Sequence, residues 1–272
     1  MNLPDLLDRQ IQLREDRRAY VLATVVEIFG SSSAKPAAKA LIDASGNVIA
    51  GWIGGGCAQA MVSKTAIDTI KSGEPCMMDI DLTDEIFGAG MPCGGSMRVY
   101  VEPVLPKPQL WLMGHGRILE SLCEFGHTLG FAVIVNDTLA RSESFPCAQR
   151  IINDDLRYQQ LQAQKEDFIV VATHHKNDYE ALRQALGSDA TYIALVSSRK
   201  RAKLVLDRLR REPVDEAQLA RIHAPAGLDL GAKLPEEIAL SIATEMLMVR
   251  RGGSGLPLSD LRLMHQPGCD SN

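Results

Sequence analysis

Apolar residues in the first part of the chain, up to about residue 106, fall into short runs separated by polar turns. The run Tyr20–Phe29 is β-branched and apolar, which is typical of a buried strand. The stretches 4–18 and 58–71 repeat their apolar residues at helical spacing. A polar stretch with Asp79, Asp81, Asp84 and Glu85 is expected to lead to a second glycine cluster. Shorter strands are expected at 40–42, 48–50 and 97–104.

Beyond residue 107 the pattern changes to repeated units of an apolar strand followed by an amphipathic helix. The first unit has a strand at 110–113 and a helix at 118–130. Units of this kind predict a parallel sheet with helices on both faces. Further strands are expected at 131–136, 150–152, 168–173 and 192–196, and further helices at about 178–186, 200–211 and 236–250. The predicted fold class is therefore α/β: a small amino-terminal α+β domain, then a Rossmann-like domain with a parallel sheet.

A proline-rich segment separates the two patterns. Residues 103–109 read PVLPKPQ, and three prolines so close together are not expected to continue a strand or a helix. We therefore predict one domain at 1–106 and a second at 107–251. The tail, 252–272, is rich in glycine, proline and serine and is expected to be flexible.

Composition narrows the classes of function. The chain has 272 residues, of which 46% are hydrophobic and 23% are charged, as in ordinary globular proteins. Its net charge of −5 argues against nucleic acid as a partner. No apolar run approaches the ~20 residues of a membrane span, and the charged amino terminus lacks the apolar core of a signal peptide. We therefore expect a cytoplasmic protein with no membrane partner. The six cysteines contain no CxxC pair, so a zinc ribbon is not expected.

Gly114 and Gly116 follow the first strand of the second domain. A turn that brings the start of a helix against a ligand needs glycine, because side chains would block the approach. Asp137 ends the next strand, where an acid binds a ribose hydroxyl in dinucleotide sites. Leu119 replaces the third glycine of the GxGxxG pattern. The turn thus predicts a site for NAD(P) or another nucleotide. The alternative is a tight strand–helix turn that binds no dinucleotide.

Cys57 and Cys93 each lie beside glycines, in GGGC and CGG. Glycines leave backbone amides bare, and bare amides bind anions. A thiolate among them can act as a nucleophile or as a soft-metal ligand. At the start of a predicted helix, the dipole would favour the charged form of Cys57. Both are candidate catalytic residues, and a packing role is the alternative.

Polar residues also follow later strands of the parallel sheet, where ligands bind in such folds. His174 and His175 are adjacent, so they point in different directions and do not form a chelating pair. The segment 197–201 could bind phosphate or begin a basic helix. The segment 223–232, which contains Asp229, is rich in turn residues and is expected to fold over the end of the sheet.

The order of these motifs resembles that of the XdhC/CoxI family. The resemblance runs from about Tyr20 to Arg251 and includes GSS, GGGC, CGG, a glycine turn, SSRKR, HAPAGLDLGA and PEEIALSI. In that family an XdhC/CoxI domain precedes a Rossmann-type domain. The resemblance implies an accessory protein that binds molybdenum cofactor (molybdopterin), shelters it during sulfuration and delivers it to a molybdenum hydroxylase such as xanthine dehydrogenase or carbon monoxide dehydrogenase.

Partners and site residues follow from the same resemblance. The implied partners are the client hydroxylase and a cysteine desulfurase, and a homodimer is expected to shield the cofactor. Cys57 and Cys93 are the implied ligands of the cofactor's molybdenum. The other implied binding residues, together with those singled out above, are Gly30, Ser31, Ser32, Lys39, Gly54, Gly55, Gly56, Gly94, Gly95, Gly114, Gly116, Asp137, His174, His175 and Asp229.

Three segments depart from the family pattern. The early loop reads GSSSAKPAAK instead of GSSPRPPGAK, the Rossmann turn reads GHGRIL instead of GAGHVG, and the later loop is THHK instead of THDHK. The GHGRI turn favours a CoxI-like branch. Two other functions stay open: a nucleotide- or NAD(P)-dependent enzyme of the oxidoreductase type, and a structural assembly factor that holds no ligand.

Overall fold

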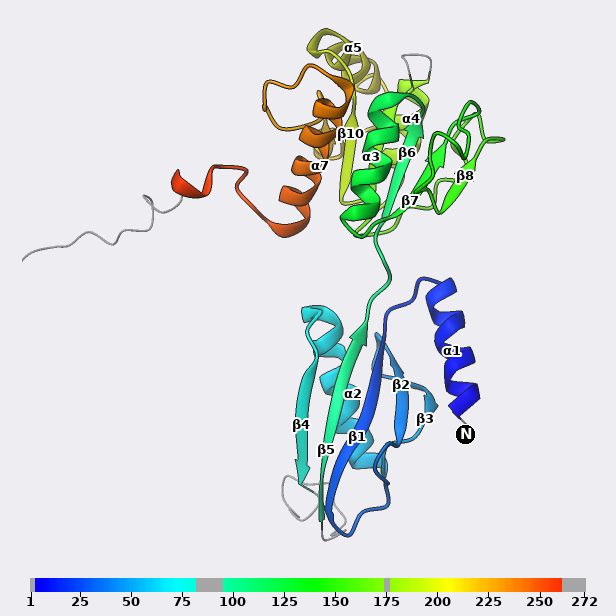
Figure 1. The fold of residues 1–272 in the computed structure, drawn as a ribbon, viewed down its shortest axis with the longest axis vertical. Coiled ribbons are helices and arrows are strands. Elements are labelled where there is room, and N and C mark those ends of the chain that lie inside the picture. The colour runs from blue at the N-terminus through cyan, green and yellow to red at the C-terminus, as the bar shows by residue number, and fades with distance from the viewer. Residues whose placement is uncertain (1–2, 82–94, 174–176, 261–272) are drawn as a thin grey trace, which may run out of the picture. The chain divides into compact units, whose positions relative to one another are not determined.

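The computed structural model describes residues 3–81, 95–173 and 177–260 (Figure 1). The chain divides into two compact units, Met1–Pro106 and Lys107–Asn272. Among the residues described, no helix combines the length and the apolar character needed to cross a membrane.

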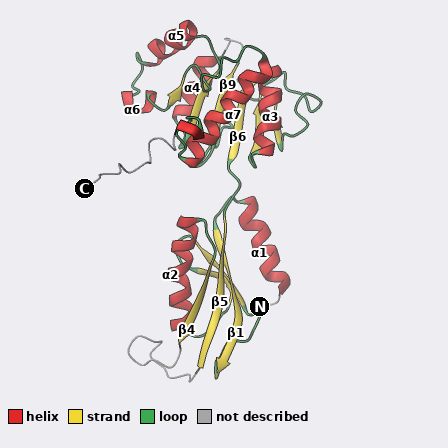
Figure 2. Ribbon diagram, turned by 60° about the vertical axis from the view of Figure 1, so that its left-hand side comes forward, coloured by secondary structure: helices red, strands yellow, loops and turns green. Residues whose placement is uncertain are grey.

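The first domain is a five-stranded antiparallel sheet in the order β3-β2-β1-β5-β4, with one helix on each face. Figure 2 shows α2 along one side of the sheet and α1 on the other. The elements are α1 (Leu3–Glu15), β1 (Tyr20–Gly30), β2 (Lys39–Asp43), β3 (Val48–Gly51), α2 (Gly56–Ser72), β4 (Cys76–Asp81) and β5 (Gly95–Val104).

Alternation along the strands divides the core of this domain into two layers. In β5, Met97 and Val99 are buried in the same cluster as Val62 of α2. On the opposite face, Leu41 of β2 is buried with Leu13 of α1. The predicted α+β arrangement is thus built by strands whose side chains point alternately to the two helices.

One expectation for this domain was wrong. Asp79 and Asp81 were expected in a polar stretch, yet they lie in the edge strand β4, because Ile80 points into the core while Asp79 points outward to Arg98. An edge strand needs only one apolar face. The strand expected at 97–104 is confirmed as part of β5, in which Pro103, the first proline of the proline-rich segment, pairs with Val21. The pairing with β4 ends at Val101, so β5 has a single neighbour at Pro103 and tolerates a residue without an N–H.

The second domain is a six-stranded parallel sheet in the order β11-β10-β9-β6-β7-β8. Its helices α3 and α7 cover one face, while α4 and α5 cover the other. The fold class expected from the sequence is therefore confirmed. The elements are β6 (Gln109–Gly114), α3 (Arg117–Thr128), β7 (Ala132–Asn136), β8 (Arg150–Ile152), β9 (Phe168–Ala172), α4 (Asp178–Leu186), β10 (Tyr192–Leu195), α5 (Arg199–Leu209), α6 (Glu216–Leu219), β11 (Ile222–His223) and α7 (Pro235–Arg251).

Two short elements, α6 and β11, were not expected. They have only four and two residues, too few for a periodic pattern. In the tail, a Cβ at Gly255 would lie 2.9 Å from Met248 Sδ and 3.6 Å from Leu228 Cδ1, while residues 251–260 are all exposed. Residues 261–272 are outside the described part of the chain.

The sheet reverses its winding between β6 and β9. The strand after β6 along the chain lies on one side of it, and β9 lies on the other. Gly114, the last residue of β6, has φ 133°, and a Cβ there would lie 2.1 Å from the carbonyl oxygen of Ala172. Only glycine allows the two strand ends to approach this closely.

Replacing Gly114 with alanine should therefore force the two strand ends apart. We expect Gly114→Ala to lower the free energy of unfolding by about 3 kcal/mol or more, measured by urea denaturation. Gly130→Ala is the matched control, since Gly130 also has positive φ but nothing lies within 4 Å of its Cβ position. The control should lose only about 1–2 kcal/mol. Equal losses in the two variants would contradict this account.

Candidate functional site

The glycine motifs of the first domain meet at one end of its sheet. Gly30, the last residue of β1, pairs with Gly95, the first residue of β5. A Cβ on Gly95 would lie 2.5 Å from the carbonyl oxygens of both Phe29 and Ser31. The backbone of Gly95, the last residue of the CGG motif, therefore rests on the GSS loop, and a side chain at residue 95 would separate them.

The GGGC motif reaches the same end. Gly54 is buried, with φ 140°, and a Cβ there would lie 3.4 Å from Met97 Cε and 4.0 Å from Ala34 Cβ. Ala34 lies in the early loop, where its N–H donates to Ser32 Oγ at 3.2 Å. Three segments that are far apart in the sequence are thus brought together.

Cys57 lies at this end as the second residue of α2 and is exposed. The cap residue Gly55 makes no side-chain cap, and the space around the Cβ positions of Gly55 and Gly56 is open. A helix start of this kind presents backbone N–H groups without side chains, which suits an anion. Cys93 and Gly94 lie outside the described residues, directly before Gly95 in the chain.

Lys39 does not lie with the glycine segments and Cys57. Its Nζ donates to Thr24 Oγ1 at 2.8 Å. It shares its face of β2 with Leu41, which is buried with α1, whereas Ala40 and the helix that carries Cys57 lie on the other face. The sheet therefore separates Lys39 from Cys57.

In the second domain a cavity of about 290 Å³ lies at the switch point between β6 and β9. His115, Gly116 and Arg117 line it from the first turn, and Ala172 lines it from the end of β9. Ligands of open parallel sheets bind at such a position. The glycine turn predicted from the sequence thus borders a cavity at the expected edge of the sheet.

The acid expected to bind ribose is close to a histidine. Asp137 Oδ1 lies 3.1 Å from His115 Nδ1 and accepts the N–H of Leu139 at 2.8 Å. A ribose would have to compete with these neighbours for the carboxylate. Under the turn, the buried side chain of Leu119 fills the space where the GxGxxG pattern has glycine.

Basic residues near the strand ends have partners within the domain. Arg117 Nη2 lies 2.5 Å from Glu236 Oε1 and joins the first turns of α3 and α7. Arg201 Nε donates to the buried Asp178 at 3.2 Å, and its N–H donates to the Ser198 side chain that caps α5. The predicted basic segment therefore begins a helix. His174 and His175 lie outside the described residues.

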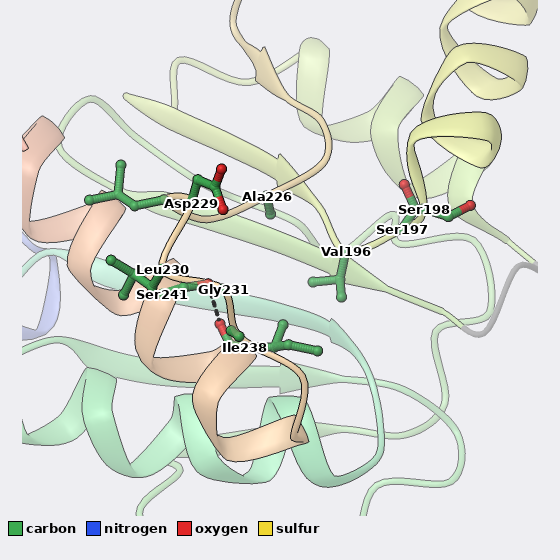
Figure 3. A pocket seen from close by; sticks show the side chains of 11 residues that line it. Val196, Ser197, Ser198, Ala226, Asp229, Leu230, Gly231, Ile238 and Ser241 are labelled. Carbon is green, nitrogen blue, oxygen red and sulfur yellow. Dashed lines mark hydrogen bonds between the residues drawn. The ribbon is translucent and has the colours of Figure 1, made fainter.

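A second cavity, of about 400 Å³, is lined by the residues drawn in Figure 3. Val196 lines both cavities. Ser197 and Ser198 line the second cavity from the turn after β10, while Asp229 lines it from the loop 224–234. The turn residues of this segment predicted a loop. The cavity exists because that loop folds back on α7, and no local sequence pattern shows this contact.

A buried carboxylate anchors this loop. Glu245 of α7 accepts hydrogen bonds from the Tyr192 hydroxyl and the Gly227 N–H, the latter at 2.8 Å, and its Oε1 lies 3.0 Å from His223 Nδ1. Burial by itself raises the pKa of Glu245, but the bonds from His223, Tyr192 and Gly227 bring it below the usual 4.5. Sequence analysis missed Glu245, because one acid on an amphipathic helix gives no local signal.

This anchor makes stability depend on pH. Because the pKa of Glu245 is lowered in the folded state, its stabilising effect is complete above the unfolded value near 4.5 and is lost as pH falls through the folded value. At neutral pH, Glu245→Gln should lower the free energy of unfolding by about 2 kcal/mol. The difference from wild type should shrink in acid, as measured by urea denaturation at several pH values.

Glu124→Gln, on the exposed side of α3, is the matched control and should change stability by less than about 0.5 kcal/mol. A difference between wild type and Glu245→Gln that stayed the same throughout the acid range would count against the carboxylate as the anchor.

Comparison with known proteins matches both domains. Residues 13–81 match the model of the XdhC and CoxI family, and residues 110–246 match the XdhC Rossmann domain. A crystal structure of a xanthine dehydrogenase from Bacillus halodurans is 23% identical, with a TM-score of 0.48, over 96% of this chain and 100% of that chain.

Two curated relatives are also similar. "Uncharacterized protein YqeB" of Escherichia coli (strain K12) is 29% identical over 90% of this chain, and a probable xanthine dehydrogenase subunit of Bacillus subtilis (strain 168) is 31% identical over 56% of it. Each match covers 46% of the relative, so the chain spans about half the length of the curated relatives it matches. The ordered matches of both domains show that this chain belongs to the XdhC and CoxI family.

Proposed function

We propose that this chain is an accessory factor that binds molybdenum cofactor, protects it and aids its sulfuration and its insertion into a molybdenum hydroxylase of the xanthine dehydrogenase type. The observation that carries the proposal is that Gly30, Gly54 and Gly95, from the GSS, GGGC and CGG segments, lie at the end of the sheet where α2 begins with the exposed Cys57. The relative named as a probable xanthine dehydrogenase subunit supports the choice of client.

The residues at this end of the first domain suit such a cargo. Molybdopterin carries a phosphate and a dithiolene-bound molybdenum. The bare N–H groups at Gly55 and Gly56 are suited to the phosphate. The exposed thiol of Cys57, with Cys93 as a second candidate, is suited to a soft metal centre. Because the cargo must be released to the client, we expect moderate affinity.

Two further partners belong to the same proposal. A cysteine desulfurase would supply the sulfur, and a second copy of this chain would shield the cargo in a homodimer. We place the whole process in the cytoplasm.

The cysteine role can be tested on the full chain. Purified wild type should carry molybdopterin, detected by its fluorescence after oxidation, and should activate an apo-hydroxylase. Cys57→Ala should reduce both by at least tenfold, because the soft ligand is lost. Cys147→Ala, at a half-buried cysteine outside the glycine segments, is the control and should change neither. Wild-type cargo and activation in both Cys57→Ala and Cys93→Ala would rule out the cysteine role.

A nucleotide-dependent enzyme is the second candidate. It is favoured by the cavity at the switch point of a Rossmann-type sheet. The proximity of His115 to Asp137 and the presence of Leu119 weigh against a dinucleotide.

Calorimetric titration separates the two functions. We expect NAD(H), NADP(H) and nucleoside triphosphates to bind weakly, because a ribose must compete with His115 for Asp137. Tight binding of one of them, followed by turnover of a substrate, would favour the enzyme.

A further inference from the structure

The outer side of α7 carries a stripe of residues that the domain leaves exposed. Glu237, Leu240, Thr244, Leu247 and Arg251 follow one another at spacings of three and four residues, so they lie on one side of the helix. Leu240 and Leu247 are 49% and 40% exposed. The two charged residues at the ends are exposed as well. We call these residues the α7 stripe.

The opposite side of α7 supplies the packing that the domain needs. Ala239, Ile242 and Met246 are buried in the core beneath the helix. On the same face of the sheet, α3 packs beside α7 (Figure 1). A helix that is buried on one side normally presents polar residues on the other. The two leucines of the α7 stripe break that rule, and the core of the domain does not explain them.

Exposed leucines continue beyond both ends of the helix. Leu230 and Leu234 precede α7, Leu256 and Leu258 follow it, and each of these side chains is about half exposed or more. A single apolar side chain on a surface is ordinary. A series of leucines along one helix and both of its flanking segments is typical of a surface that binds another protein.

The charges of the α7 stripe indicate which protein that is. Glu237 lies in the first turn of the helix and Arg251 is its last residue, so the stripe is acidic at one end and basic at the other, with leucines between. A stripe in this order is complementary to a reversed copy of itself. Two copies related by a two-fold axis near Thr244 would interdigitate their leucines and set Glu237 of each copy against Arg251 of the other. The opposed helix dipoles also favour this arrangement.

We propose that the chain forms a homodimer through the α7 stripe, with the two copies of α7 packed antiparallel about a two-fold axis near Thr244. The proposed function includes a second copy of the chain but gives it no surface. This inference names the surface, lies wholly in the second domain and needs no cargo. One pair of helices makes a small interface, so we expect dimers that dissociate at about micromolar concentration.

The leucines can be tested on the full chain by sedimentation equilibrium at several concentrations. Leu240→Gln and Leu247→Gln should each raise the dissociation constant of the dimer at least tenfold, because an amide would replace an apolar side chain at the centre of the interface. Leu204→Gln is the matched control and should leave the dissociation constant unchanged, since Leu204 is 57% exposed on α5, which covers the other face of the sheet.

The charges give a second test that does not depend on apolar area. Glu237→Lys and Arg251→Glu each set like charges together at both ends of the pair, so each variant alone should dimerise at least tenfold more weakly. In an equimolar mixture of the two variants, each end of a mixed pair again joins opposite charges. Native mass spectrometry should therefore show heterodimers and little of either homodimer.

The mixture also controls for local damage to the helix. Glu237 Oε2 accepts the N–H groups of Lys233 and Leu234 at the start of α7, so Glu237→Lys loses this cap as well as a charge. Loss of the cap alone would weaken the variant in every pairing, whereas the charge pattern predicts that it recovers with Arg251→Glu.

Three results would overturn the assignment. The first is a wild type that stays monomeric, including one that captures an apo-hydroxylase through Leu240, since the stripe would then belong to the client. The second is an undiminished dimer in both leucine variants. The third is a mixture of the charge variants with no more heterodimer than random pairing gives.

These outcomes are separable from the proposed function. If the leucine variants stayed dimeric and delivered molybdopterin normally, the α7 surface would be wrong while the accessory function stood. If wild type dimerised through α7 but carried no molybdopterin, the surface would be confirmed and the proposed cargo would be wrong.

Discussion

The second domain depends on a backbone contact that leaves no room for a side chain. Gly114 at the end of β6 lies against the carbonyl oxygen of Ala172 at the end of β9. The chain leaves β6 for α3 on one face of the sheet and leaves β9 for α4 on the other. Because the two connections diverge from adjacent strand ends, a cavity opens between them. The contact therefore sets the position of any ligand at this edge of the sheet.

The first domain uses the same constraint at its glycine-rich end. Gly95 rests on the carbonyl oxygens of Phe29 and Ser31, and Gly54 lies close to Met97. These contacts gather three loop segments and leave Cys57 exposed at the start of α2. Glycine here serves close packing and also leaves amides bare, so one residue type supports both the fold and the proposed binding.

The carboxylates at the end of the parallel sheet differ in whether other residues of the domain already hydrogen-bond them. Glu245 is buried and satisfied by Tyr192, His223 and Gly227, so it holds the loop in place. Asp137 has His115 beside it. Asp229, on the loop that Glu245 anchors, has no such partner among the described residues. Its carboxylate is exposed to solvent, so the fold does not use it.

The sequence by itself determined the fold class, most of the elements and the glycine and cysteine motifs, because periodicity and glycine spacing are local properties. It did not reveal β4, whose alternation is hidden among acidic residues. Tertiary structure alone decided that Lys39 lies away from Cys57, that His115 lies beside Asp137 and that Glu245 holds the loop of Asp229. The residues in each of these pairs are distant in the sequence. Whether they come close together depends on how strands and helices pack, which no local sequence pattern encodes.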